Sequence, residues 1–425
     1  MIDQPATLQT ELTAIVGGEH VRPARPSDAI DGVQPQLIVS PGDADEIAQV
    51  VQLANGAGLR VAPRGGGSKI DWGNPPTALD LILSAARLDQ VVEHAWGDMT
   101  ATVQAGCTVA RLQTVLAEHG QRLALDPLWP DATTIGGMLA TNDSGALRQR
   151  FGSLRDLILG ITVVLPDGTI ARSGGKVVKN VAGYDLPKLM TGALGTLGVI
   201  TEATFRLYPL PATTYTASIH APAVTTLLEL LLKILDSTLV STGVQLHVGS
   251  DHAPRLDVRF EGLAAVIDVQ LQHLRRLRTD VKGAIGIGDE VAPSWAAREL
   301  IWQNSDDALV AKTSVLPTNL ADLIASIERV ARPLRLKWEL VAQAIGVGTL
   351  RLDGANEQVL LTALTLLRAE IANLGGSCVV QHCPPSLKGR IDVWGATGDA
   401  QPLMQRVKQH FDPNNILNPG RFTGF

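Results

Sequence analysis

The segment 63–68, with the sequence PRGGGS, places three consecutive glycines directly after a short apolar run. That run, residues 59–62, is expected to form a strand. Because glycine has no Cβ, the loop can adopt positive φ and bring its backbone close to a ligand. Successive N–H groups in such a turn can converge on an anion, most often a phosphate. A plain surface turn is the alternative that the same residues allow.

Two further segments in the first half are rich in small and hydrogen-bonding residues. One is 133–145, which contains Ile-Gly-Gly and Asn-Asp-Ser-Gly, and the other is 192–201. Three separated loops of this kind suggest a long ligand with several polar groups, such as a dinucleotide. None of them fits the G-x-G-x-x-G fingerprint of the Rossmann fold. The pyrophosphate of such a ligand would therefore be held by loops.

These three segments, together with 174–186 and the tail 411–422, resemble the FAD-linked oxidase family. The family comprises flavoproteins of the vanillyl-alcohol oxidase and p-cresol methylhydroxylase (PCMH) type. The matching segments cover the first half of the chain and its extreme end. Segment 179–186 and the short Asn-Asp-Ser-Gly loop are most similar to the FAD-binding subunits of glycolate oxidases.

The resemblance and the element pattern together predict an α+β architecture. Residues 1–210 are expected to form a PCMH-type, two-subdomain FAD-binding domain, which ends at the Pro-Leu-Pro sequence 209–211. Residues 211–400 read twice as β-α-β-β-α, which predicts an α/β cap domain of two ferredoxin-like halves sharing one sheet. Residues 401–425 are expected to form a last helix and a tail that returns to the first domain.

The resemblance implies FAD as the cofactor. Some relatives attach the flavin through a histidine in or just after the glycine loop, but Ser68 and Lys69 stand there, so non-covalent FAD is predicted. Two alternatives remain open from the residues alone: 142–145 as a turn bonding its own backbone, and Val199 and Ile200 as ordinary core strand residues. The residues assigned to FAD are Pro63, Arg64, Gly65, Gly66, Gly67, Ser68, Lys69, Pro127, Thr133, Thr134, Gly136, Gly137, Asn142, Ser144, Gly145, Val199 and Ile200.

No catalytic residue is assigned, and three side chains are candidates. Arg421 stands where relatives usually carry a basic residue near the flavin, and a cation there would stabilise a reduced flavin or a substrate carboxylate. A solvated terminal arginine is the competing interpretation. Lys179 lies in a polar run with an embedded tyrosine, which a surface loop would also explain. His382 is the third candidate, as a catalytic base.

The cap lacks the His-x-His and Gly-Asp-Gly motif by which 2-hydroxy acid oxidases of the family supply metal ligands and a base. The nearest equivalent, residues 379–385, keeps only His382. One histidine cannot hold a divalent metal. His247 and His252 have no carboxylate partner at a recognisable spacing. No metal site is therefore predicted.

Composition narrows the class of protein. Of 425 residues 45% are hydrophobic, 18% are charged and the net charge is −6, which fits a soluble globular protein of two domains or one elaborate one. No basic block indicates a nucleic-acid surface. The three cysteines fit neither a disulfide framework nor an iron–sulfur or zinc pattern. An iron–sulfur cluster would have to be carried by another chain.

The N-terminus lacks the basic and apolar regions of a signal peptide, and no apolar run approaches the roughly 20 residues that span a bilayer. A cytoplasmic protein that contacts a membrane only through partners is expected.

The sequence thus predicts an FAD-binding subunit of a glycolate oxidase complex. By resemblance, a sister flavoprotein with the intact histidine motif would oxidise the small 2-hydroxy acid, and an iron–sulfur subunit would carry electrons onward. A self-sufficient 2-hydroxy acid oxidase or dehydrogenase and a structural subunit whose flavin never turns over are the alternatives.

Overall fold

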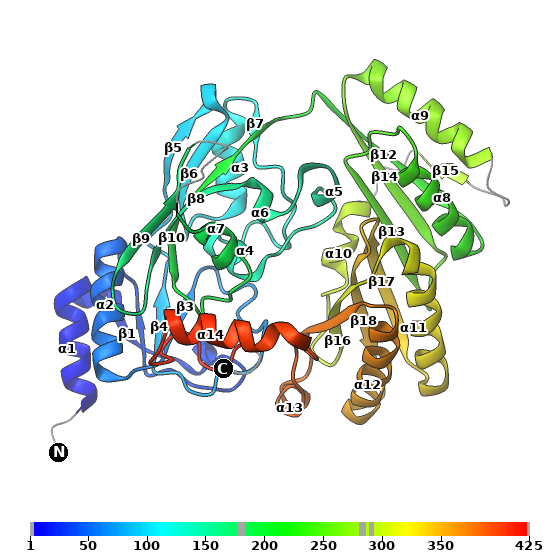
Figure 1. Ribbon diagram of the computed structural model, residues 1–425. Helices are drawn as coiled ribbons and strands as arrows, with labels where there is room; N and C mark the ends of the chain where they lie inside the picture. The colour runs from blue at the N-terminus through cyan, green and yellow to red at the C-terminus, as the bar shows by residue number, and fades with distance from the viewer. Residues whose placement is uncertain (1–3, 177–182, 280–285, 289–292, 423–425) are drawn as a thin grey trace. The chain divides into compact units, whose positions relative to one another are not determined.

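The computed structural model describes residues 4–176, 183–279, 286–288 and 293–422. Contacts divide the chain into two units (Figure 1). The first unit holds the residues up to Ser144, the segment Ser153–Leu210 and the residues from Ala396 on. The second holds Gly145–Gly152 and Pro211–Gly395. Each unit has its own sheets and core.

The first unit begins with a small sheet in the order β1-β2-β4-β3, in which β2, β4 and β3 are parallel and β1 is antiparallel. Its strands are β1 (Val21–Pro23), β2 (Leu37–Val39), β3 (Val61–Arg64) and β4 (Leu81–Ser84), and its helices are α1 (Gln4–Val16) and α2 (Ala44–Ala57). Asp43 caps α2 by accepting a 2.8 Å hydrogen bond from the Glu46 N–H. The helix ends at Ala57, and Gly58 is its C-cap.

A second sheet of the first unit is antiparallel, in the order β5-β6-β10-β8-β9. It contains β5 (Val91–Ala95), β6 (Thr100–Gln104), β8 (Ile158–Val164), β9 (Ile170–Gly174) and β10 (Val199–Arg206), and a short pair joins β7 (Gln121–Arg122) to β11 (Tyr208–Pro209). The helices of this part are α3 (Val109–Ala117), α4 (Ile135–Thr141), α6 (Leu154–Leu157) and α7 (Leu186–Met190). Strands β8 and β9 form a hairpin around residues 166–168.

The second unit is built on one eight-stranded sheet, in the order β15-β12-β14-β13-β17-β18-β16-β19. Its strands are β12 (Thr213–His220), β13 (Gly243–Gly249), β14 (Arg255–Gly262), β15 (Gly286–Gly288), β16 (Leu309–Ser314), β17 (Lys337–Gln343), β18 (Val347–Asp353) and β19 (Ser377–His382). Its helices are α5 (Arg148–Phe151), α8 (Val224–Asp236), α9 (Ala264–Thr279), α10 (Ala297–Leu300), α11 (Leu320–Leu334), α12 (Glu357–Asn373) and α13 (Pro385–Lys388).

The sheet of the second unit contains two halves of equal design. Each half supplies four strands in the spatial order fourth, first, third, second, and the halves meet where β13 pairs with β17. This is the ferredoxin-like duplication that the repeated pattern predicts. Helices α8, α9, α11 and α12 contribute apolar residues to one core with alternate strand positions such as Leu246 and Leu340. The opposite sheet face therefore carries the intervening, mainly polar positions, among them His247 and Glu339.

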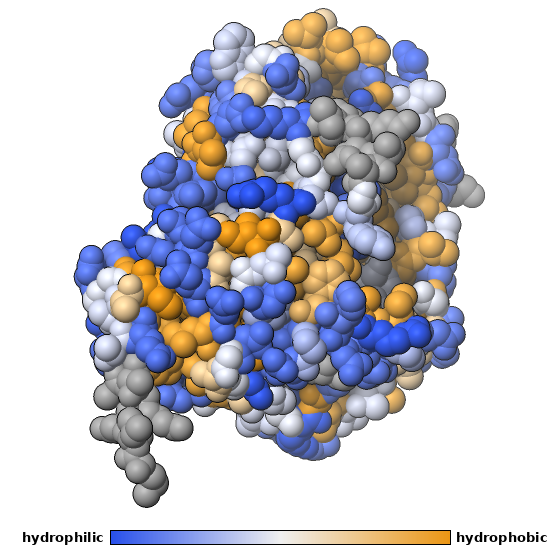
Figure 2. Space-filling model, turned by 60° about the vertical axis from the view of Figure 1, so that its left-hand side comes forward, coloured by the Kyte–Doolittle hydropathy of each residue, from blue (hydrophilic) through white to orange (hydrophobic). Residues whose placement is uncertain are grey.

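The last helix, α14 (Gln401–Phe411), leads into a tail that lies against β3 (Figure 1). The Val61 N–H donates to the Ile416 carbonyl and the Asn418 N–H to the Val61 carbonyl, at 2.8 and 2.9 Å. No described helix is long and apolar enough to cross a membrane. On the face shown in Figure 2, hydrophobic residues lie in separate patches among hydrophilic ones.

The turn after α14 is held by a buried ion pair. Lys408 Nζ lies 2.5 Å from Asp412 Oδ2 and also donates to the carbonyls of Thr196 and Leu417, at 2.9 and 3.0 Å. The Asp412 carboxylate accepts the N–H groups of Ile416 and Leu417. Both ionic side chains are at most 3% exposed.

We expect Asp412→Ala to lower the free energy of unfolding of the first unit by about 3–5 kcal/mol, because it leaves a buried lysine without its counter-ion. Urea unfolding followed by circular dichroism measures the loss. Asp399→Ala, at an exposed position before the same helix, is the matched control. A loss for Asp412→Ala no larger than that of the control would contradict this assignment.

Candidate cofactor-binding site

The glycine loop after β3 packs directly on the backbone of a second segment. A Cβ on Gly65 would overlap the Thr134 hydroxyl, and a Cβ on Gly66 would overlap the Ala132 carbonyl. Gly67 has a φ of +75°, a conformation that side chains other than glycine rarely adopt. A distinct physical constraint therefore requires glycine at each of the three positions. Together the glycines bring two distant segments into backbone contact.

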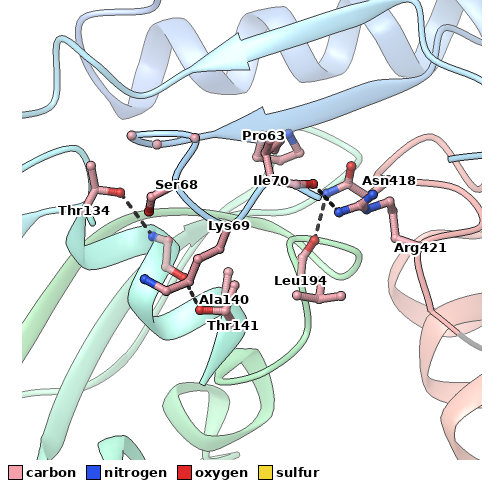
Figure 3. Close-up of a pocket in the computed structure, with 14 residues that line it drawn as sticks. Pro63, Ser68, Lys69, Ile70, Thr134, Ala140, Thr141, Leu194, Asn418 and Arg421 are labelled. Carbon is pink, nitrogen blue, oxygen red and sulfur yellow. Dashed lines mark hydrogen bonds between the residues drawn. The ribbon is translucent and has the colours of Figure 1, made fainter. Parts of the chain in front are cut away.

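The same loop presents hydrogen-bond donors to a cavity. Within the described part of the chain, the N–H groups of Gly65, Gly66 and Gly67 donate to no carbonyl or side chain. All three residues line an open cavity (Figure 3). Backbone donors in proteins are rarely left without an acceptor. An anionic group with several oxygens, such as a pyrophosphate, would satisfy them.

The second wall of this cavity is helix α4, which corrects the interpretation of residues 133–137 as a loop. Thr134 is the N-cap, and its hydroxyl accepts the Gly137 N–H at 3.3 Å. The helix shows small residues on one face, since Thr134, Gly137, Ala140 and Thr141 all line the cavity. The Ile-Gly-Gly sequence resembled a loop, but the glycines here permit close helix packing: a Cβ on Gly136 would lie 2.9 Å from that of Ala105.

The third wall comes from two segments that are far apart in sequence. Leu194 belongs to the loop before β10, and Asn418 belongs to the C-terminal tail. The Asn418 side chain donates to the Leu194 carbonyl at 2.7 Å (Figure 3). The tail thus closes the cavity that the glycine loop opens.

A second cavity lies against the same central residues. The two cavities share Pro63, Gly65, Gly137, Ala140 and Leu194. The second one is otherwise lined by small and apolar residues: Leu83, Ala85, Ala105, Gly136, Gly195, Gly198, Val199 and Ile200, with Arg64. The arrangement suits an elongated ligand with an anionic middle and a flat, less polar end.

Most of the residues assigned to FAD line one of these cavities: Pro63, Arg64, Gly65, Gly66, Gly67, Ser68, Lys69, Thr134, Gly136, Gly137, Val199 and Ile200. Pro127, Thr133, Asn142, Ser144 and Gly145 do not, and Gly145 falls in the second unit. Asn142 ends α4 with a φ of +49°, and its buried side-chain oxygen has no partner within the described residues. Ile70, Ala140, Thr141, Leu194 and Asn418 were missed; the small-residue face of α4 was the one available signal.

Lys69 and Thr133 form an internal polar cluster beside the loop. Lys69 Nζ lies 2.5 Å from the Thr133 hydroxyl, 3.1 Å from the Leu128 carbonyl and 3.3 Å from Asp143 Oδ2. The lysine and aspartate side chains are at most 3% exposed. The lysine charge is therefore largely balanced by a protein carboxylate.

Arg421 is not a solvated terminal arginine, because it is buried and lines the first cavity. Its guanidinium lies 3.1 Å from Asp31 Oδ2 and donates to the carbonyls of Asn74, Ile70 and Trp72. Burial lowers the pKa of this guanidinium, and the Asp31 carboxylate opposes that shift. The side chain thus clamps the segment after the glycine loop to the tail.

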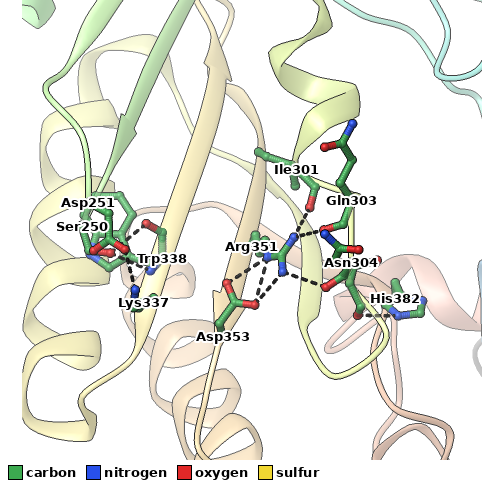
Figure 4. A network of polar contacts seen from close by, with 11 residues as sticks. Ser250, Asp251, Ile301, Gln303, Asn304, Lys337, Trp338, Arg351, Asp353 and His382 are labelled. Atoms are coloured by element: carbon green, nitrogen blue, oxygen red, sulfur yellow. Dashed lines mark hydrogen bonds and ion pairs between the residues drawn. The ribbon is translucent and has the colours of Figure 1, made fainter.

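Of the other two catalytic candidates, the structure describes only His382, which belongs to the second unit. His382 is half-buried at the end of β19, with Nε2 3.0 Å from the Ser305 carbonyl (Figure 4). Nearby, Arg351 donates to the carbonyls of Ile301 and Asn304 and pairs with Asp353. Lys179 lies outside the described residues.

His247 and His252 do have a carboxylate neighbour, contrary to expectation. Glu339 Oε1 lies 2.5 Å from His247 Nε2 and 3.9 Å from His252 Nε2. The sequence did not reveal it because Glu339 comes from the other half of the cap, 92 residues after His247.

Comparison with known proteins identifies the family. The pattern described as "FAD binding domain" matches residues 35–174, and "FAD linked oxidases, C-terminal domain" matches residues 287–422. The chain belongs to the FAD-linked oxidase family. FAD is its cofactor, as predicted.

Individual relatives cover nearly the whole length of this FAD-linked oxidase. It is 26% identical to glycolate oxidase subunit GlcD of Bacillus subtilis over 91% of this chain and 88% of the relative. It is 28% identical to mitochondrial D-2-hydroxyglutarate dehydrogenase of Bos taurus over 90% and 76%. The solved structure of p-cresol methylhydroxylase superposes with a TM-score of 0.80 at 17% identity, covering 99% and 97%. That similarity confirms the PCMH-type, two-domain fold.

The site fits FAD on structural grounds. The unpaired N–H groups of Gly65–Gly67 would hold the pyrophosphate, and the cavity beside Val199 and Ile200 would take one of the two ring ends. No Cβ of the loop obstructs the approach, since all three residues are glycine. The non-covalent link, predicted from Ser68 and Lys69, stays a prediction.

We expect Gly66→Ala to weaken FAD binding about fivefold or more. The added Cβ must displace the loop from Ala132, and overpacking of this kind costs about 1–3 kcal/mol. FAD titration followed by flavin fluorescence measures the change. Gly56→Ala is the control, because a Cβ on Gly56 of α2 meets nothing within 4 Å. Wild-type FAD affinity in a correctly folded Gly66→Ala variant would contradict the assigned cradle.

Proposed function

We propose that this flavoprotein is the FAD-binding subunit of a complex that oxidises glycolate to glyoxylate. The observation that carries the proposal is a contrast between the cofactor site and the catalytic candidates. The first unit presents backbone donors to an FAD-sized site, whereas the described catalytic candidates are engaged in internal contacts. Arg421 is enclosed by Asp31 and three carbonyls, and the His382 ring bonds a backbone carbonyl.

The substrate class rests on the relatives. Glycolate oxidase subunit GlcD, D-lactate dehydrogenase and D-2-hydroxyglutarate dehydrogenase are named for substrates with a hydroxyl group beside a carboxylate. Oxidation of such a substrate removes two electrons and two protons from its alcohol carbon, and bound FAD supplies the redox chemistry. The residues of this chain position the cofactor and compensate its charge.

The proposed complex has two further members. A catalytic flavoprotein with the intact histidine motif supplies the base, and an iron–sulfur subunit accepts the electrons. This chain contributes its own FAD and a docking surface. The complex is cytoplasmic, with any membrane contact made through the partners.

A self-sufficient 2-hydroxy acid dehydrogenase is the second candidate. The match to D-2-hydroxyglutarate dehydrogenase favours it, because that match includes the cap as well as the FAD-binding domain. In this alternative His382 would be the base.

Anaerobic titration of the purified, FAD-loaded chain with glycolate separates the candidates. We expect no loss of flavin absorbance with the chain alone, and a loss when the catalytic and iron–sulfur subunits are added. Bleaching of the isolated chain would replace the subunit proposal by the self-sufficient enzyme. No bleaching of this chain's flavin in the assembled complex would leave a structural subunit.

We further expect His382→Ala to change the turnover of the assembled complex by less than about threefold, whereas loss of a general base costs about 10²–10⁴-fold. His273→Ala, a half-buried histidine of α9, is the matched control. A hundredfold loss confined to His382→Ala would identify that residue as the base and disprove its structural role.

A further inference from the structure

Two imidazoles and one carboxylate converge on the polar sheet face of the cap. His247 comes from β13, His252 from the loop after it, and Glu339 from β17. Their ligand atoms all lie within 4.8 Å of one another. The His247 and His252 rings are 4.3 Å apart between centroids. The site is reachable from solvent, because the side chains of His252 and Glu339 are 35% and 31% exposed.

The loop that carries His252 is anchored to the strand that carries Glu339. Ser250 and Trp338 exchange two hydrogen bonds, from the Ser250 N–H to the Trp338 carbonyl at 2.9 Å and from the Trp338 N–H to the Ser250 hydroxyl at 3.2 Å. Lys337 and Asp251 add an ion pair at 2.8 Å (Figure 4). The cluster is therefore held together by contacts outside it.

Gly249 makes room for the histidine. A Cβ on Gly249 would lie 2.7 Å from His252 Nε2 and 2.8 Å from the Trp338 carbonyl. Only a residue without a Cβ lets the His252 ring lie this close to the sheet. The imidazole nitrogen of His252 occupies the space that a side chain at position 249 would need.

The charges around the cluster suit a cation. Glu339 Oε1 lies 2.5 Å from His247 Nε2 and 3.9 Å from His252 Nε2, so one carboxylate oxygen faces both imidazoles. The positive charge of Arg351, the strand neighbour of Glu339, is balanced by Asp353 through contacts of 2.8–3.0 Å. Two imidazoles and one carboxylate are a ligand set that zinc accepts, with a fourth position for water.

We propose that His247, His252 and Glu339 form a Zn²⁺ site in the cap, outside the FAD cradle. The metal joins the two ferredoxin-like halves at their common seam, since β13 and β17 are the strands through which the halves pair. Two ligands come from the first half and one from the second. Because zinc would bind the folded cap and not the unfolded chain, its binding would stabilise the cap through mass action.

The test measures zinc itself rather than activity. The chain, freed of any affinity tag and stripped with a chelator, is titrated with ZnCl₂ by calorimetry and its thermal midpoint is recorded with and without zinc. We expect about one Zn²⁺ per chain and an upward shift of the midpoint. Co²⁺ in place of zinc should give the visible absorption of a four-coordinate ion.

His252→Ala is the principal variant, because the residue lies in an exposed loop and its loss leaves the sheet intact. We expect zinc affinity to fall at least about tenfold in this variant and in Glu339→Gln. His220→Ala, an exposed histidine of β12, should bind zinc like the wild type. Absence of zinc uptake by the wild type, or equal losses in His252→Ala and His220→Ala, would overturn the proposal and leave an ordinary hydrogen-bonded cluster.

Discussion

The backbone contact between the glycine loop and residues 132–134 is the constraint on which the first unit depends. Gly65 and Gly66 can lie against Ala132 and Thr134 only because they have no Cβ. This contact orders a loop whose N–H groups have no acceptor within the described chain. Backbone donors without an acceptor destabilise a folded protein. An anionic cofactor would accept hydrogen bonds from these N–H groups and remove that cost.

The C-terminal tail secures that arrangement from the other side. The buried Lys408–Asp412 pair fixes the turn after α14, and the tail then runs beside β3 to Asn418 and Arg421. Arg421 ties the segment after the glycine loop to the tail through Asp31 and backbone carbonyls. Lys69 and Arg421 are both cations beside the cavity, and each is paired with a carboxylate of the protein itself, Asp143 and Asp31. The cradle relies on backbone donors for much of its attraction to an anion.

In the cap, polar and apolar side chains are separated onto the two faces of one sheet. Its helices cover one face of the sheet, while the other face carries paired charges such as Arg255 with Asp257 and Arg351 with Asp353. Neighbouring strand positions alternate between the two faces, so a single sheet supports both a large apolar core and a polar surface. The proposed zinc site uses this polar face at the seam between the two halves. The proposed subunit role and the zinc site therefore rest on separate parts of the chain.

The sequence by itself determined the local elements and the cofactor class. Helix α14 lies where the last helix was expected, at the start of residues 401–425, because amphipathic periodicity is a local property. The glycine loop and the repeated cap pattern were likewise evident, since each depends on neighbouring residues. Helix α4 was misread because its glycines serve packing against Ala105, a contact that no local pattern records.

Only the tertiary structure decided which distant residues meet. Asn418 reaches Leu194, Arg421 reaches Asp31, and Glu339 reaches His247, in each case across a separation that no spacing rule covers. The physical reason is that strand pairing and chain return place these side chains together, whereas sequence patterns report only the period of a single element. Local patterns therefore predicted most segments, apart from helix α4, and the fold decided which segments meet.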